Sequence, residues 1–86
     1  MTREEILSEV NAIFRREFEV ENPGLEDNIR EQYGLDSLDA IELLMQIEEF
    51  LGAELTREEK KKALYLQTVN QICDYIESLA KVRSLM

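Results

Sequence analysis

The chain has 86 residues, 44% of them hydrophobic and 34% charged, so it can build one small core beneath an ordinary polar surface. Ten Lys and Arg against nineteen Asp and Glu give a formal net charge of −9, which opposes binding to nucleic acids and anionic membranes and favours basic partners. With no His and one Cys, the chain cannot assemble a Cys/His metal site, a Ser-His-Asp triad or a Cys-His pair. These counts exclude most enzyme mechanisms.

The sequence shows no pattern of a targeting segment or a membrane anchor. Glu4, Glu5 and Glu9 argue against a transit peptide, and no apolar stretch approaches the ~20 residues that a membrane span needs. A lone Cys cannot form an internal disulfide and suits a reducing compartment. We therefore expect a cytoplasmic monomer in which residues 1–86 form a single domain, without a nucleic-acid partner and without stable membrane insertion.

The first helix is predicted over about residues 3–18. It begins with the capping box Thr2-Arg3-Glu4-Glu5, and its apolar residues recur at the spacing of one helical face: Ile6, Leu7, Val10, Ile13, Phe14 and Phe18. Asn22-Pro23-Gly24 then predicts a turn. The connection from Glu19 to Leu35 is unusually long, which is typical of functional loops, and it carries four apolar anchors: Leu25, Ile29, Tyr33 and Leu35.

Three more helices follow the long connection. Asp36 can cap a helix that runs to about Leu51 and stops at Gly52. Capping boxes at residues 56–59 and 68–71 predict a short helix to about Leu66 and a last helix with one apolar face. No segment shows the alternation of a strand. The expected fold is an all-α four-helix bundle with a long first loop and a short third helix.

The second predicted helix has two apolar stripes. Leu43, Ile47 and Leu51, supported by Ala40 and Phe50, form the natural core face. A second stripe lies roughly 140° around the helix and consists of Leu38, Ile41 and Met45. Either a crowded bundle buries both stripes, or the second one is exposed and binds a partner.

Acidic residues favour the second interpretation. Glu42, Glu48 and Glu49 flank the second stripe, and Asp39 lies beyond Glu42. From Glu31 through Thr56 the segment has seven acidic residues and no Lys or Arg. A partner would then present basic residues around a small apolar patch, and salt would weaken the encounter. Acidic faces are also commonly just solvated, so the charge by itself does not decide the question.

Ser37 stands in the first turn of this helix, between Asp36 and Leu38. A Ser at that place is most often a simple helix cap. As an alternative, its hydroxyl is a site of modification at which a phosphate ester is formed. The positive end of the helix would tolerate the negative charge of such an ester. The chain has no His to activate Ser37, so another enzyme would have to do so.

The residues from Tyr33 to Glu49 resemble the acyl carrier proteins. Gly34-Leu35-Asp36-Ser37-Leu38 matches their phosphopantetheine attachment motif, Gly-x-Asp-Ser-Leu, at the end of a long loop and the start of an acidic helix. The resemblance covers nearly the whole chain. It implies that a phosphopantetheinyl transferase moves 4'-phosphopantetheine from coenzyme A to Ser37, and that the thiol of this arm carries acyl groups as thioesters. The protein would then be a carrier and a substrate of other enzymes, with no catalytic residue and no metal.

The resemblance also implies roles for residues near Ser37. Basic patches on the transferase and on acyl-transferring, condensing or acyl-ligating enzymes would meet an acidic and apolar surface made of Asp36, Leu38, Asp39, Ile41, Glu42, Met45, Glu48 and Glu49. In the family the acyl chain can slip between the helices, which would bring it near Leu43, Ile47, Phe50 and Leu51. Fatty acid, lipid and polyketide-type biosynthesis are all compatible with the motif.

Some features depart from the family pattern. Lys60, Lys61 and Lys62 make the third helix basic, where members that serve fatty acid synthesis are commonly acidic, so a specialised carrier is favoured. These lysines can also be merely solvated. Two alternatives stay open for the function: an unmodified acidic helical module that binds a basic partner, and a peptidyl or D-alanyl carrier. Cys73 is expected to be a small buried hydrophobic residue.

Overall fold

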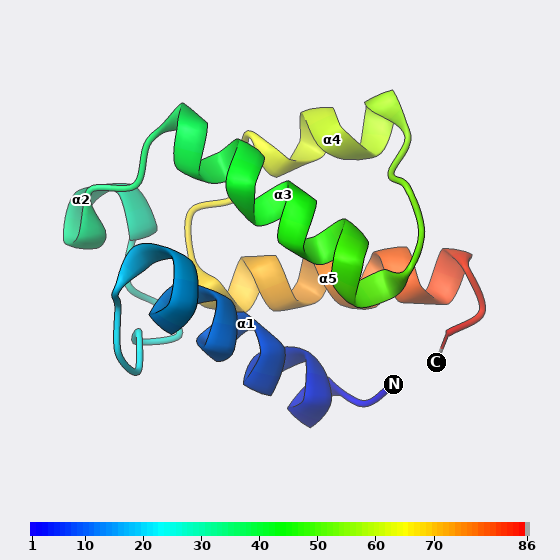
Figure 1. Ribbon diagram of the computed structural model, residues 1–86, viewed down its shortest axis with the longest axis horizontal. Coiled ribbons are helices and arrows are strands. Elements are labelled where there is room, and N and C mark those ends of the chain that lie inside the picture. Colours follow the sequence, from blue (N-terminus) through cyan, green and yellow to red (C-terminus); the bar gives the residue numbers. More distant parts are fainter. Residues whose placement is uncertain (86) are drawn as a thin grey trace.

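The computed structural model describes residues 1–85, which form five helices (Figure 1). In chain order they are α1 (Arg3–Phe18), α2 (Ile29–Tyr33), α3 (Ser37–Leu51), α4 (Arg57–Ala63) and α5 (Val69–Val82). Within these residues there is no strand, only an isolated antiparallel bridge between Asn28 and Thr68. The predicted all-α class is confirmed, and α1, α3, α4 and α5 are the four expected helices.

The helices surround one hydrophobic core. In Figure 1, α1 runs antiparallel to both α3 and α5, and α4 lies along the other side of α3. The side chains with the least exposure come mainly from α1, α3 and α5: Ile6, Val10, Ile13, Phe14, Ile47, Val69, Ile72, Cys73 and Ile76. Burial of this apolar surface is the main favourable term in the stability of so small a chain.

Reciprocal capping boxes start three of the helices. They pair Thr2 with Glu5, Asp36 with Asp39, and Thr56 with Glu59. The box predicted at Thr68 is only half formed. The Thr68 hydroxyl accepts from the Gln71 N–H at 3.1 Å, but the Gln71 side chain accepts from the N–H of Gln67 and not from that of Thr68.

The short helix α2 lies inside the long connection and was not predicted. Asn28 caps it, because its side-chain oxygen accepts from the N–H groups of Arg30 and Glu31, both at 3.0 Å. Gly34 ends it at φ 69°, in the left-handed region that glycine adopts without cost. Five residues are too few for an apolar period to reveal a helix in the sequence.

The long connection is tied to the start of α5. The Ile29 N–H donates to the Gln67 carbonyl at 2.8 Å, and the Asn70 N–H donates to the Leu25 carbonyl at 3.0 Å. Ile29 is buried, and Tyr33 and Leu35 pack against the core as predicted. The expectation for the Leu25 side chain was wrong: it is exposed, and only its carbonyl serves as an anchor.

The third predicted helix ends earlier than expected. Regular α-helix stops at Ala63, and the N–H groups of Leu64, Tyr65 and Leu66 each donate to the carbonyl three residues before them. This tighter turn completes the end of α4. It leaves the side chains of Leu64 and Tyr65 exposed and that of Leu66 packed against the core.

A polar contact with α5 holds α4 in place. The Arg83 guanidinium donates to both carboxylate oxygens of Glu59, at 2.6 and 2.9 Å, and to the Glu54 carbonyl at 3.1 Å. The hydroxyl of buried Tyr75 donates to the Glu59 carbonyl. The Arg83 hydrogen bonds, together with the Thr56 N–H, lower the pKa of Glu59 from its ordinary 4.5 to about 2. A helix of seven residues has little stability of its own, so this anchor fixes α4.

Replacing Arg83 by Met should lower the free energy of unfolding by about 2 kcal/mol, because Glu59 and the Glu54 carbonyl lose a charged donor. In the wild type, the contribution of the Glu59 ion pair is present above pH 4.5 and is lost as the pH falls toward about 2, since the folded-state pKa is the lower one. The variant should lack this part of the acid dependence. Urea titrations from pH 7 to pH 2 measure both effects.

The matched control is Lys81→Met, which removes an exposed cation from the same helix. It should leave stability at pH 7 nearly unchanged. Equal losses in the two variants would contradict a specific role of Arg83.

Candidate functional site

The first turn of α3 is organised by two carboxylates. One Asp36 oxygen accepts from the N–H groups of Leu38 and Asp39 at 3.0 and 3.1 Å, and an Asp39 oxygen accepts from the Asp36 N–H at 2.9 Å. Donation from the backbone of Asp39 is the main reason that the pKa of Asp36 is lowered. Both residues therefore already have a structural role, as the reciprocal cap of this helix.

Ser37 does not cap the helix. It is the first helical residue, one position after the cap, and its side chain is exposed. Within residues 1–85 its hydroxyl forms no hydrogen bond with another protein group. Because Asp36 performs the capping, the Ser37 oxygen is left accessible at the positive end of a fifteen-residue helix.

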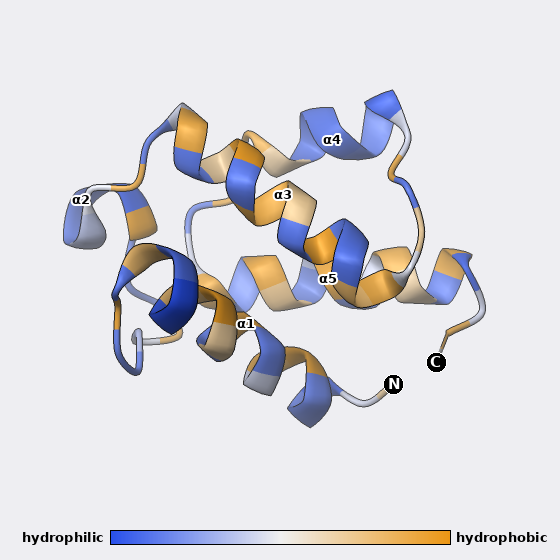
Figure 2. Ribbon diagram, in the orientation of Figure 1, coloured by the Kyte–Doolittle hydropathy of each residue, from blue (hydrophilic) through white to orange (hydrophobic). Residues whose placement is uncertain are grey.

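The second apolar stripe of α3 is exposed. The exposed fractions of Leu38, Ile41 and Met45 are 75%, 54% and 55%, whereas the opposite face of the helix packs into the core through Leu43, Leu44, Ile47 and Leu51. In Figure 2, hydrophobic and hydrophilic segments alternate along α3. The interpretation in which the bundle buries both stripes is therefore wrong. A contiguous exposed stripe of this kind is typical of an interaction surface.

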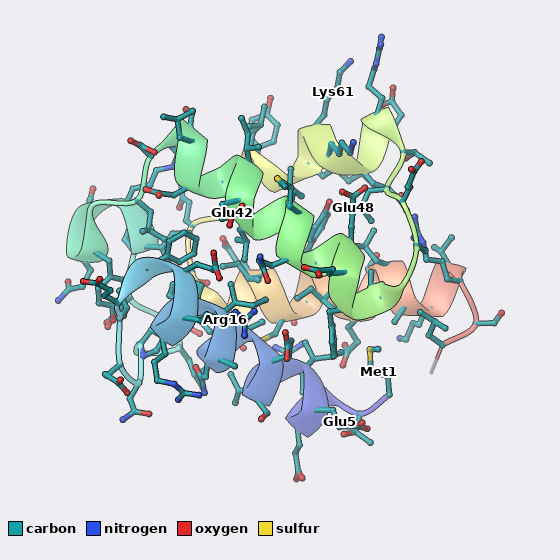
Figure 3. All side chains as sticks on the ribbon, viewed as in Figure 1. Met1, Glu5, Arg16, Glu42, Glu48 and Lys61 are labelled. Carbon is teal, nitrogen blue, oxygen red and sulfur yellow. The ribbon has the colours of Figure 1, made fainter. Side chains whose placement is uncertain are left out.

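The acidic residues along this stripe differ in what they contact. Glu49 is exposed. Glu48 lies between α3 and α4 in Figure 3, where its carboxylate accepts from the Leu55 N–H at 2.9 Å and lies 3.9 Å from the Lys60 ammonium. The structure thus gives Glu48 a role in holding the connection after α3, which sequence analysis did not foresee. Glu42 and Glu49 line a groove with Met45 near the end of the helix.

Glu42 is paired with another acid. A hydrogen bond with the Glu17 carboxyl of α1 raises the pKa of Glu42, and desolvation and the charges of Glu17 and Glu49 act in the same direction. Arg16 lies beside this pair, since its guanidinium donates to the Gln46 side chain at 2.8 Å and to that of Glu17 at 3.1 Å. The local sequence gave no signal for this contact between α1 and α3.

A small apolar cavity lies between α2, α3 and α4. It measures about 20 Å³ and is lined by Ile29, Leu35, Ala40, Leu43, Ala63 and Leu66, with Arg30, Asp36 and Asp39 at its polar edge. This volume is enough for about one water molecule and too small for an acyl chain. Of the four residues expected near an acyl chain, only Leu43 reaches this cavity.

Residues 1–85 contain no group of three or more potential metal ligands. Among the same residues, no helix is long and apolar enough to cross a bilayer. Cys73 is buried on α5 as expected, and burial raises the pKa of its thiol, which makes it less reactive.

Comparison with known proteins identifies the family. Residues 8–76 match the family described as "Phosphopantetheine attachment site". An acyl carrier protein of Rubrobacter xylanophilus is 37% identical over 88% of this chain and 93% of its own length. The chain belongs to the acyl carrier protein family. A second acyl carrier protein, from Thermosynechococcus vestitus, is 36% identical over 91% of this chain and 95% of its own length.

A solved structure agrees with this assignment. The acyl carrier protein from Enterococcus faecalis superimposes with a TM-score of 0.67 at 32% identity, covering 91% of this chain and 98% of that one. The resemblance noted from Gly34 to Leu38 is therefore confirmed over most of the chain. Acyl carrier proteins are carriers rather than enzymes, and they interact with phosphopantetheinyl transferases and with acyl-handling enzymes.

The prosthetic group of this family is 4'-phosphopantetheine. The residues at the start of α3 fit such a group, because a phosphate ester is stable at the positive end of a helix and the Ser37 hydroxyl has no protein partner to lose. Gly34 leaves open space beside the loop that leads to this turn, since a Cβ atom there would meet nothing within 4 Å.

Replacing Glu17 by Gln should lower the pKa of Glu42, because the variant removes the negative charge of residue 17 and the hydrogen bond between the two carboxyl groups. A raised folded-state pKa means that Glu42 adds stability at acid pH, which is lost as the pH rises through that pKa. The Glu17→Gln variant should lack this additional stability at acid pH. NMR titration of the Glu42 carboxyl carbon and unfolding measured against pH test the two effects. Glu4→Gln, at the exposed start of α1, should leave the Glu42 titration unchanged.

Proposed function

We propose that this protein carries acyl groups as thioesters on a 4'-phosphopantetheine arm attached to Ser37. The observation that supports this proposal best is the free, exposed Ser37 hydroxyl beside a helix cap made entirely by Asp36 and Asp39. A serine that served only as a cap would use its own oxygen for the backbone N–H groups. The alternative in which Ser37 is merely a cap thus loses its physical basis.

The attachment is a phosphoryl transfer. The Ser37 oxygen forms a bond to the pantetheine-bearing phosphorus of coenzyme A, the pyrophosphate P–O bond breaks, and adenosine 3',5'-bisphosphate leaves. The serine proton passes to a base of the transferase, because this chain has no His and the nearby Asp36 and Asp39 carboxylates are engaged with backbone N–H groups. Once attached, the arm supplies the thiol that bears the acyl group. The exposed position of Ser37 allows both the transferase and later enzymes to reach it.

We further propose that α3 provides the surface to which these enzymes bind. Leu38, Ile41 and Met45 supply apolar area, and Glu42 and Glu49 supply negative charge that is not committed to the backbone. Asp36, Asp39 and Glu48 add to the negative field while they hold the helix ends. Electrostatic steering of this kind mainly raises the association rate and selects basic partners.

The cargo is proposed to be an acyl intermediate of fatty acid, lipid or polyketide-type biosynthesis in the cytoplasm, with the carrier acting as a monomer. The concentrated negative charge of α3 supports acyl rather than peptidyl cargo. The cavity beside α3 would have to expand by separation of the helices to shelter a long chain, because its volume of about 20 Å³ has room for only about one water molecule.

Incubation with a broad-specificity phosphopantetheinyl transferase and coenzyme A should add one phosphopantetheine group to the intact mass of the wild-type protein. Ser37→Ala should abolish the gain, while Ser78→Ala, an exposed serine on α5, should keep it. No gain on folded protein with several transferases would refute the attachment. The α3 surface would then belong to an unmodified helical interaction module.

The double variant Glu42→Lys/Glu49→Lys should lower kcat/KM of the same transferase by about threefold to thirtyfold, because each change places a cation against a basic patch. The wild-type rate should fall as salt is raised, and the rate of the variant should depend less on salt. Glu4→Lys/Glu21→Lys, which makes the same change in net charge at two exposed acidic residues outside α3, is the control. Equal effects of the control and α3 changes would indicate net charge instead of a docking surface.

A further inference from the structure

The outer side of α4 forms a second exposed surface that the proposed function does not use. Arg57, Lys61 and Leu64 are spaced at i, i+4 and i+7 and so share one face. Lys62 and Tyr65 continue this face on its flank toward α5, where they line a groove with Gln71, Asp74 and Tyr75. Arg57, Lys61, Lys62, Leu64 and Tyr65 are all exposed, Leu64 by 54% and Tyr65 by 81%. We call these five residues the α4 surface. It combines cations with apolar area in a chain whose net charge is −9.

The cations of the α4 surface are not neutralised within the described part of the chain. Lys60 is also exposed, but its ammonium lies 3.9 Å from the Glu48 carboxylate of α3. Among residues 1–85, Lys61 and Lys62 take part in no ion pair, although Glu58 stands four residues before Lys62. Figure 3 shows Lys61 projecting outward from α4, on the side away from α5. These two charges are therefore available to acidic groups outside the chain.

The α4 surface has a fixed place relative to the α3 stripe. The anchor of Glu59 by Arg83 and the contact of Lys60 with Glu48 hold α4 against both α5 and α3. In Figure 1 the two helices lie side by side, with the end of α4 close to the first half of α3. A partner that covers both helices would contact the negative charge of α3 and the adjacent positive charge of α4.

We propose that the α4 surface is a second docking element, which selects an acyl-handling enzyme whose face is basic opposite α3 and acidic opposite α4. This inference rests on the proposed function for the class of partner. Lys61 and Lys62 would pair with the acidic part of that face, and Leu64 and Tyr65 would cover apolar area beside it. The same lysines would repel enzymes with a uniformly basic carrier-docking patch, so attraction and repulsion together set the choice of partner.

The test uses a condensing enzyme selected for a carrier-docking patch that is uniformly basic. Its affinity for the unmodified 86-residue chain is measured by surface plasmon resonance, so the readout does not require the arm. The double variant Lys61→Glu/Lys62→Glu should bind about tenfold more tightly than the wild type, because two repulsive contacts become attractive. The gain should shrink as salt is raised.

A compensating change in the enzyme tests the acidic half of the proposal. Basic residues of its patch are replaced by Glu one at a time. At least one replacement should tighten binding of the wild-type chain about threefold or more and should weaken binding of the double variant. Opposite effects of this kind indicate energetic coupling between that enzyme residue and the α4 lysines. If no replacement shows this opposite effect, the idea of an acidic partner region is overturned.

Single variants separate a local effect from net charge. Lys61→Glu should tighten binding to the condensing enzyme, whereas Lys81→Glu, on the exposed side of α5, should change it little. Equal effects of these two variants, or no effect of the double variant, would show that the lysines are only solvated charges. Circular dichroism confirms that each variant is folded. Failure of Ser37 to accept phosphopantetheine would refute the carrier function and would leave this binding measurement fully interpretable.

Discussion

The cap at the start of α3 determines the arrangement of the site. Asp36 and Asp39 satisfy each other's backbone N–H groups and the N–H of Leu38, which fixes the residue at which the helix begins. The cap also leaves the Ser37 hydroxyl without a partner at the positive end of the helix. After the cap, packing of Leu43, Ile47 and Leu51 in the core turns Leu38, Ile41 and Met45 outward.

A second polar anchor gives the short helix α4 its position. Seven residues cannot sustain a helix alone, and α4 has only one residue, Ala63, fully in the core. Glu59 compensates for this, because its carboxylate receives two hydrogen bonds from Arg83 and its carbonyl receives one from Tyr75. The resulting placement beside α3 turns an isolated basic segment into part of a surface with two signs of charge. Relative position, more than the charges themselves, makes such a surface selective.

The acids on and around α3 fall into two groups once their partners are known. Asp36, Asp39 and Glu48 hold backbone N–H groups, so their charges cannot be removed without loosening a helix end or a connection. Glu42 and Glu49 make no such contact, and they can be changed with less effect on the fold. The repulsion between Glu17 and Glu42 adds a cost at neutral pH that the packing of α1 on α3 outweighs. A basic partner that covers Glu42 would relieve this repulsion.

Much of this protein is determined by the sequence itself. Capping residues and apolar spacing are local signals, so they predicted α1, α3, α4 and α5, and the Gly34 to Leu38 motif predicted the family.

Contacts between distant segments carry no local signal, and only the tertiary structure decided them. The five residues after Asn28 became α2 because the loop pairs with the start of α5, and the Leu25 side chain stayed outside because only its carbonyl is used there. Likewise, the segment from Glu31 to Thr56 contains no cation, yet in the fold Arg16 donates to Gln46 and Lys60 lies near Glu48. Packing of α1 and α4 on α3 brings these side chains from other elements into contact with it. The tertiary structure also decided whether the second stripe of α3 is covered, because two stripes on one helix can be buried only by neighbours on both sides. The packing of α1, α4 and α5 leaves the second stripe exposed.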